Sequence, residues 1–152
     1  MTADLAERIG RIEDLLAIQD LQALYARYAD NGWPGAVGDS TALAGLFAPD
    51  GVWSSERVGT FTGREEIIAG LGGGSMPFSM HLLMSPHIMI EGDQASGTWR
   101  ALFALTTGGG DALWAGGGYQ VSYVRLPEGW RISRLETVSA FMSPYGQSWA
   151  KA

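Results

Sequence analysis

The chain holds two histidines, His81 and His87, and His81 stands in the middle of the apolar stretch Met80–Met84. An imidazole buried among apolar neighbours needs a hydrogen-bond partner, because burying it unpaired costs free energy. A paired histidine is also the usual general base near neutral pH. Asp30, at the end of the first predicted helix, is the best candidate for that partner, and the two residues together could abstract a proton.

Tyr25 precedes Asp30 by five residues, and a phenol there could donate a hydrogen bond to a developing oxyanion or to a departing hydroxyl. Five residues turn a regular helix by about 140°. Both side chains can therefore face one cavity only if the helix end loosens or the cavity wraps around it. Structural roles remain open for all three residues: a core histidine bonded to a backbone carbonyl for His81, a helix cap for Asp30, and an apolar stripe for Tyr25.

His87 lies six residues after His81, so strict alternation along a strand would place both on one face unless Pro86 introduces a bulge or a break. Further convincing ligands are lacking, and we predict no metal site. The glycine triplets at 72–74, 108–110 and 116–118 lack the Lys-Ser/Thr ending of a phosphate-binding loop. We therefore predict no cofactor, and expect the third triplet to let a strand bend.

Length and composition fit a single globular domain over residues 1–152, with 46% hydrophobic residues. A net charge of −6 without a basic stripe argues against nucleic acid and anionic membranes as partners. The absence of cysteine excludes disulfides and cysteinyl metal sites. The first ten residues do not resemble a signal peptide, and no apolar run approaches the length of a membrane span, so we expect a cytoplasmic protein.

The first third of the chain is predicted to be helical, because apolar residues recur at steps of three and four over residues 5–28. The apolar stripe changes sides near residues 15–18. We therefore expect a bend or two consecutive helices, ended by the Asn-Gly-Trp-Pro-Gly cluster at 31–35. The first stripe comprises Leu5, Ile9, Ile12 and Leu16, and the second comprises Ile18, Leu21, Tyr25 and Tyr28.

The remainder of the chain is predicted to be rich in strands, with two more helices ahead of four long strands. A short helix capped by Asp39 or Ser40 should carry Leu43, Leu46 and Phe47 on one side, and a third helix should cover residues 63–70. Asp50-Gly51 is a turn signal. Short strands are expected at 52–55 and 58–61 around a Glu56-Arg57 tip, and long ones near 79–91, 95–106, 112–125 and 130–142. Turn-forming separators between the long strands predict an antiparallel meander. Early helices covering one face would give an α+β layer with a concave face.

Several local strings, in this order and at this spacing, resemble a known family over nearly the whole chain. They are Ala-Ile-Gln-Asp-Leu at 17–21, Leu-Phe-Ala-Pro-Asp-Gly-Val-Trp at 46–53, Phe-Thr-Gly-Arg at 61–64, Ile-Glu-Gly-Asp-Gln-Ala at 90–95 and Gly-Trp-Arg-Ile at 129–132. The chain is similar to the SnoaL-like family of the nuclear transport factor 2 superfamily, which includes scytalone dehydratase, bile acid 7α-dehydratase, hexachlorocyclohexane dehydrochlorinase and ketosteroid isomerase. The resemblance implies a cone-shaped α+β fold with N-terminal helices on a strongly curved, mostly antiparallel sheet.

The resemblance also implies roles for single residues. In the dehydratase and dehydrochlorinase relatives, a histidine on the first long strand pairs with an aspartate at the end of the long helix, and the matching residues here are His81 and Asp30. Tyr25 keeps the interval to the aspartate found in the bile acid dehydratase, and Trp53 matches a pocket tryptophan of the dehydrochlorinase. That relative has an arginine where this chain has Leu135, which argues against halide elimination. Relatives form dimers or trimers, so a homodimer or homotrimer is expected.

The leading hypothesis is a cofactor-independent lyase, most simply a dehydratase, or an isomerase, acting on a hydrophobic cyclic small molecule. Its catalytic residues would be His81, Asp30 and Tyr25. The alternative is a non-catalytic small-molecule-binding or assembly module of the same fold, because fold alone does not settle activity. Aromatic side chains suit the wall of a hydrophobic pocket, and the candidates are Trp53, Trp99 and Phe141, followed by Trp114, Tyr119 and Phe103.

Overall fold

One six-stranded sheet forms the frame of the molecule, in the order β2-β1-β6-β5-β4-β3. The computed structural model describes residues 4–72 and 76–149. Neighbouring strands run antiparallel except β1 and β6, which are parallel. The elements are α1 (Leu5–Ala29), α2 (Ser40–Gly45), β1 (Phe47–Ser55), β2 (Gly59–Thr62), α3 (Gly63–Leu71), β3 (Phe78–Glu91), β4 (Gln94–Thr106), β5 (Ala112–Leu126) and β6 (Gly129–Pro144).

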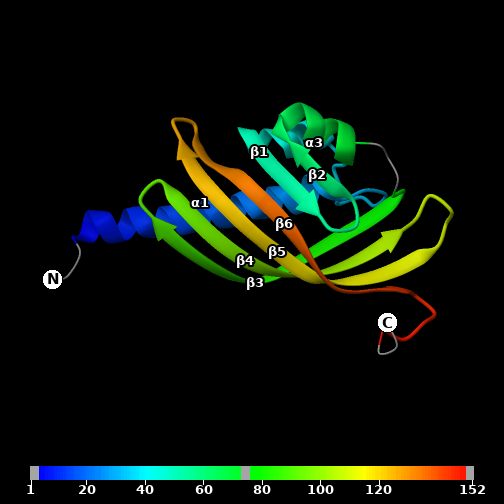
Figure 1. Cartoon of the computed structure of the whole chain (residues 1–152). Coiled ribbons are helices and arrows are strands. Elements are labelled where there is room, and N and C mark those ends of the chain that lie inside the picture. Colours follow the sequence, from blue (N-terminus) through cyan, green and yellow to red (C-terminus); the bar gives the residue numbers. More distant parts are fainter. Residues whose placement is uncertain (1–3, 73–75, 150–152) are drawn as a thin grey trace.

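Helix α1 is continuous, so the predicted break near residues 15–18 is wrong (Figure 1). Two residues turn a helix by about 200°, and the step from Leu16 to Ile18 therefore changes the apolar side without any interruption. The second stripe packs on the sheet, where Ile18 is fully buried, whereas the four residues of the first stripe remain 46% to 64% exposed. The helix ends at Ala29 and α2 is capped by Asp39, as the sequence predicts.

The four long strands lie within two residues of their predicted bounds. The main difference concerns β1, which begins at Phe47 and takes in Asp50-Gly51, the expected turn. Its pairing with β6 shifts register between Phe47 and Val52, so this pair of residues forms an irregularity inside a strand instead of a reversal between strands.

The long strands are strongly curved, and with the helices they form the expected cone-shaped α+β fold (Figure 1). Part of the curvature comes from the third glycine triplet. A Cβ atom on Gly118 would lie 2.1 Å from the Trp99 carbonyl oxygen of β4. The register between β5 and β6 shifts between Gly116 and Gly117. Only glycine permits backbones to approach this closely, and the shifted register bends the strand.

Polar contacts hold α1 against the sheet where β5 ends and β6 begins. The Arg125 guanidinium donates to both carboxylate oxygens of Asp14, at 2.7 and 2.6 Å, and the Trp130 indole N–H donates to Asp14 at 2.9 Å. Arg125 also stacks over the Trp130 ring, with 4.5 Å from its Cζ to the ring centroid. These contacts hold the helix across the sheet. In the described part of the chain, no helix has the length and apolar character needed to cross a membrane.

Candidate active site

Asp30 and His81 meet between α1 and β3. Asp30 is the C-terminal cap of α1 and has an extended backbone, with φ −75° and ψ 144°. Its Oδ1 atom accepts a hydrogen bond from the His81 backbone N–H at 2.8 Å and lies 2.7 Å from His81 Nδ1. The Asp30 residue is only 4% exposed. The backbone leaves the helical conformation at Asp30, so the rotation of a regular helix does not fix the direction of its side chain relative to Tyr25. Tyr25 and His81 line the same cavity, whereas Asp30 contacts His81 and is not among the described lining residues.

The segment after Asp30 is held against the start of β3. Asn31 and Ser79 exchange backbone hydrogen bonds at 3.2 and 3.1 Å, and the Ser79 hydroxyl donates to the Ala29 carbonyl at 3.0 Å. Gly32 has φ +80°, and a Cβ atom there would lie 2.2 Å from the Pro77 carbonyl oxygen. Glycine at position 32 therefore allows the close contact that brings Asp30 beside His81, the fourth residue of β3.

His81 lies on the wall of a cavity of about 480 Å³. This volume is in the usual range for small-molecule sites. Within the described residues, the Nε2 atom of His81 has no hydrogen-bond partner, since the ring bonds through Nδ1. The wall is mixed, with aromatic and aliphatic side chains beside a few hydroxyls. Its large side chains include Tyr25, Tyr28, Trp53, Phe103, Leu105, Tyr119 and Met142.

A group of buried rings surrounds the Tyr25 hydroxyl. The Trp53 indole N–H donates to the Tyr25 oxygen at 2.8 Å, and the Tyr25 and Tyr119 rings meet edge to face at 5.6 Å. Burial raises the pKa of Tyr25 to about 12, partly offset by the hydrogen bond from Trp53. Burial also raises the pKa of Tyr119 well above its usual value, and the neighbouring Tyr25 and the Asp30 carboxylate act in the same direction. Both phenols therefore stay neutral near pH 7 and can donate hydrogen bonds.

Of the three residues first predicted for the cavity wall, one lines the cavity and two lie elsewhere. Trp53 lines the cavity, whereas Trp99 and Phe141 are not among the described residues around it. Trp99 is a core residue, 8% exposed, whose indole donates to the Tyr123 hydroxyl at 3.0 Å. Phe141 packs against Gly116 and Trp149 instead. Alternation along a strand tells which residues share a face, but strand curvature decides which of them reach a cavity.

Other residues of the wall were weaker predictions or were missed. Tyr119 and Phe103 line the cavity together with His81, and the Phe103 ring meets the His81 ring edge to face at 5.1 Å. Phe103 lies opposite His81 in the β3–β4 hairpin, but this pairing can be predicted only if the register of the hairpin is known. Arg57, at the tip between β1 and β2, also lines the cavity, and no local sequence signal marks it.

His87 and the last strand lie away from the contact between Asp30 and His81. Between Met84 and His87, β3 carries one residue more than β4, and His87 lines a separate groove with Arg134 and Glu136. The bulge expected at Pro86 is therefore present. Leu135 is fully buried, while Arg134 is exposed and paired with Glu136. Across residues 4–72 and 76–149, no three His, Cys, Asp or Glu side chains cluster closely enough to hold a metal ion.

The N-terminal helices and the curved six-stranded sheet are those of α+β proteins with a nuclear transport factor 2-like fold. The model of the SnoaL-like domain family matches residues 10–136, and the chain belongs to that family. Among curated proteins, no sequence matches the chain.

Three solved structures illustrate the likeness. A type 2 hexachlorocyclohexane dehydrochlorinase (LinA) is 19% identical, with 93% of this chain and 95% of that one covered and a TM-score of 0.83. A provisionally assigned aromatic ring hydroxylase from Novosphingobium aromaticivorans is 26% identical, with coverage of 88% and 94% and a TM-score of 0.79. A provisionally assigned scytalone dehydratase from the same species is 18% identical, with coverage of 91% and 92% and a TM-score of 0.77. These likenesses confirm the predicted fold.

Proposed function

We propose that the protein is a cofactor-independent lyase, most simply a dehydratase, or an isomerase, that acts on a hydrophobic cyclic small molecule. His81 is the general base, Asp30 orients it, and Tyr25 donates a hydrogen bond to the oxygen that gains charge or leaves. The observation that carries this proposal is the 2.7 Å contact between His81 Nδ1 and Asp30 Oδ1 on the wall of a cavity of about 480 Å³.

The Asp30 carboxylate favours the tautomer in which His81 Nδ1 carries the hydrogen, because a carboxylate can only accept. The lone pair then sits on Nε2 and takes a proton from the carbon next to a carbonyl group. The electrons of the broken C–H bond form a C=C bond as the C–O bond to a β-hydroxyl breaks. The departing oxygen receives the proton from the imidazolium and leaves as water, so His81 returns to its neutral form.

Tyr25 suits the role of donor because its oxygen already accepts the Trp53 N–H at 2.8 Å. The hydroxyl hydrogen remains free to point at a substrate oxygen. The raised pKa of Tyr25, caused chiefly by burial, keeps that hydrogen in place. A neutral phenol in a water-poor cavity stabilises a developing oxyanion without first losing its own proton.

The comparisons support a lyase but do not identify the group that leaves. We infer the leaving group from the residues of this chain. The LinA relative is named a dehydrochlorinase and another relative is provisionally named a scytalone dehydratase. On the last strand here, Leu135 is buried and Arg134 pairs with Glu136, so this strand brings no guanidinium to the cavity to assist a departing halide. Loss of hydroxide, assisted by a phenol, fits the wall better.

The test is a panel of cyclic β-hydroxy ketones on decalin and steroid skeletons, followed by the ultraviolet absorbance of the conjugated enone. Exchange of the α-hydrogen in deuterated water, followed by proton NMR, reports proton abstraction even when no group leaves. We expect His81→Gln to lower both rates roughly a hundredfold or more. His87→Gln changes the only other histidine and should leave both rates unchanged. Equal rates in wild type and His81→Gln, or binding without turnover or exchange, would favour the binding module.

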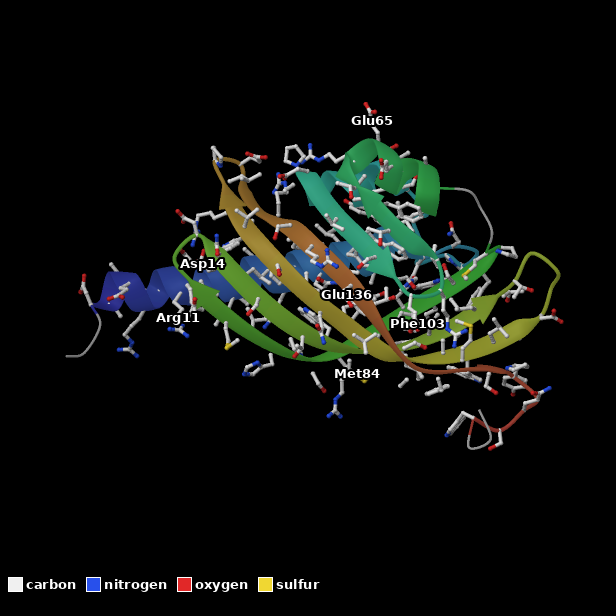
Figure 2. All side chains as sticks on the ribbon, viewed as in Figure 1. Arg11, Asp14, Glu65, Met84, Phe103 and Glu136 are labelled. Carbon is white, nitrogen blue, oxygen red and sulfur yellow. The ribbon has the colours of Figure 1, made fainter. Side chains whose placement is uncertain are left out.

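We also propose that the single SnoaL-like domain, residues 1–152, acts in the cytoplasm as a homodimer or homotrimer. Strand alternation places Leu82 and Met84 on the face of β3 opposite to His81, and they are 41% and 42% exposed. Figure 2 shows Met84 on the outer, convex side of the sheet. Large apolar side chains grouped on an exposed face are typical of an interface between subunits.

A further inference from the structure

The cavity has a single permanently charged side chain in its described wall, which is Arg57. Apart from Arg57 and the titratable His81, the wall consists of apolar residues, glycine, hydroxyl-bearing residues and one asparagine. No carboxylate lines it. An isolated cation in such a wall is informative, because the chain as a whole carries a net charge of −6.

Arg57 lies at the rim and its guanidinium is not committed to another group. It is exposed at the tip of the β1–β2 hairpin, where its backbone N–H donates to the Ser55 hydroxyl at 3.3 Å. Within residues 4–72 and 76–149 the guanidinium makes no hydrogen bond or ion pair. By contrast, Arg125 and Arg134 pair with carboxylates, and Arg64 donates to the Phe47 carbonyl.

The inner end of the cavity, beside His81, disfavours an anion, whereas Arg57 favours one. Asp30 is buried and its carboxylate contacts His81 Nδ1 at 2.7 Å. A ligand anion placed beside the dyad would meet that carboxylate at short range in a poorly hydrated space, where like charges repel strongly. An anion at Arg57 would instead gain a flexible, fork-shaped donor that matches a carboxylate.

We propose that Arg57 forms an anion-binding subsite, and that the substrate is a hydrophobic ring system bearing a carboxylate or similar anionic group. This inference rests on the proposed function and narrows its substrate class. The anion would bind at the rim and the rings would fill the cavity, so that the uncharged part of the substrate is presented to His81. Arg57 is therefore a specificity-determining residue, outside the proton-transfer steps.

The test compares two fluorescent probes that share one ring system, 1-pyrenebutyrate and the uncharged 1-pyrenebutanol. We expect wild type to bind the acid about tenfold more tightly than the alcohol at low salt, with the preference shrinking near 1 M salt. Arg57→Gln should weaken the acid about tenfold and leave the alcohol unchanged. Arg11→Gln is the matched control, because it removes the same charge from the exposed part of α1, away from the cavity (Figure 2).

The two arms separate this inference from the proposed function. Equal affinities for acid and alcohol in wild type, or an identical loss in the Arg57 and Arg11 variants, would overturn the anion subsite while leaving a hydrophobic binding cavity intact. Binding of the alcohol, together with a shift of the His81 imidazole signals in NMR, supports the cavity as the ligand site. Binding of neither probe would count against both the subsite and the hydrophobic substrate.

Discussion

The Oδ1 atom of Asp30 lies within hydrogen-bond distance of two His81 nitrogens, the backbone N at 2.8 Å and Nδ1 at 2.7 Å. One carboxylate oxygen thus fixes both the position of β3 and the orientation of the imidazole ring. The pair links the end of α1 to a strand 51 residues further along the chain. Structural and chemical roles therefore coincide in this aspartate, and substitutions can separate them.

Asp30→Ala should destabilise the protein by about 3 kcal/mol, because two donors of His81 lose their acceptor in a poorly hydrated place. Asp30→Asn keeps an acceptor for the backbone N–H and should cost only about 1 kcal/mol. Urea unfolding at pH 7 measures both differences. In nitrogen NMR, wild type should show the His81 tautomer with hydrogen on Nδ1. Asp30→Ala removes the acceptor of the Nδ1 hydrogen, so the tautomer with hydrogen on Nε2 should become populated. Identical tautomers in both proteins would contradict the orienting role.

Tyr25→Phe should reduce turnover in the β-hydroxy ketone assay about tenfold to a hundredfold, with a smaller effect on substrate affinity. It also leaves the buried Trp53 indole N–H without its acceptor, so we expect a loss of stability of about 1 to 2 kcal/mol. Trp53→Phe removes the donor but leaves the phenol, and should reduce turnover less. If Tyr25→Phe turns over at the wild-type rate while losing stability, the hydroxyl is only structural.

Stability should fall steeply in alkaline solution. Burial raises the pKa of Tyr25 to about 12, and it also raises the pKa values of Tyr119 and Tyr123 above the usual 10.0. Between pH 10 and 12 the unfolded chain releases protons that the folded protein retains. The contribution of these phenols to stability is therefore complete below pH 10 and is lost as the pH rises. The free energy of unfolding in urea, measured from pH 8 to 11.5, gives the slope.

Tyr123→Phe removes one of the three buried phenols and should make this alkaline slope shallower, whatever it does to stability at pH 8. Tyr145→Phe is the control, because the Tyr145 residue is 72% exposed and its hydroxyl meets water in both states. A slope that the two variants leave equally steep would show that the buried phenols are not its source.

Asp14 provides a test in acid. The hydrogen bonds from Arg125 are the main cause that lowers the Asp14 pKa below 3.8. A lowered pKa means that the carboxylate contributes stability above its unfolded pKa and loses it as the pH falls through the folded pKa. Asp14→Asn should therefore cost about 1 to 2 kcal/mol at pH 7, with the gap closing at low pH. Asp93→Asn, whose side chain is 79% exposed, should have little effect, and a gap that persists in acid would contradict this account.

Assembly can be tested by light scattering of the purified protein. We expect the mass of a dimer or trimer for wild type. Met84→Glu should shift the protein toward monomer, because burying an unpaired charge in an interface on the outer face of the sheet costs free energy. Ile12→Glu alters the exposed stripe of α1 instead, and comparing the two variants assigns the interface. A monomeric wild type would refute the proposed homo-oligomer.

The long strands were predictable because glycine, proline and acidic turn residues separate them cleanly, as at Glu91-Gly92-Asp93. The parallel pairing of β1 with β6 was not predictable, because β1 ends at Ser55 and β6 begins only at Gly129, and local patterns carry no information on pairing between strands so far apart in the sequence. The continuity of α1 was not predicted, because the apolar stripe moves to another side of the helix between Leu16 and Ile18. In the sequence, such a change of side resembles an interruption of the helix.

The candidate site was predictable to a similar extent. The resemblance placed Asp30 and His81 together, and the structure puts them in contact. Periodicity alone left this open, because the contact depends on how the chain leaves α1. Trp99 and Phe141 were expected in the wall and lie outside it, because Trp99 bonds to Tyr123 in the core and Phe141 packs against Gly116 and Trp149. Arg57 had no signal, as a charged residue in a hairpin tip is ordinary in sequence.

The extra residue that β3 carries between Met84 and His87 sends the two imidazoles to opposite faces of the sheet. His81 lines the cavity, whereas His87 lies in the groove with Arg134 and Glu136. Ser85, with its positive φ of 51°, lies inside this irregularity. Deletion of Ser85 should exchange the faces of His87 and Ile88, which would press an imidazole against the apolar core where Ile88 now packs and would expose the isoleucine on the outer groove.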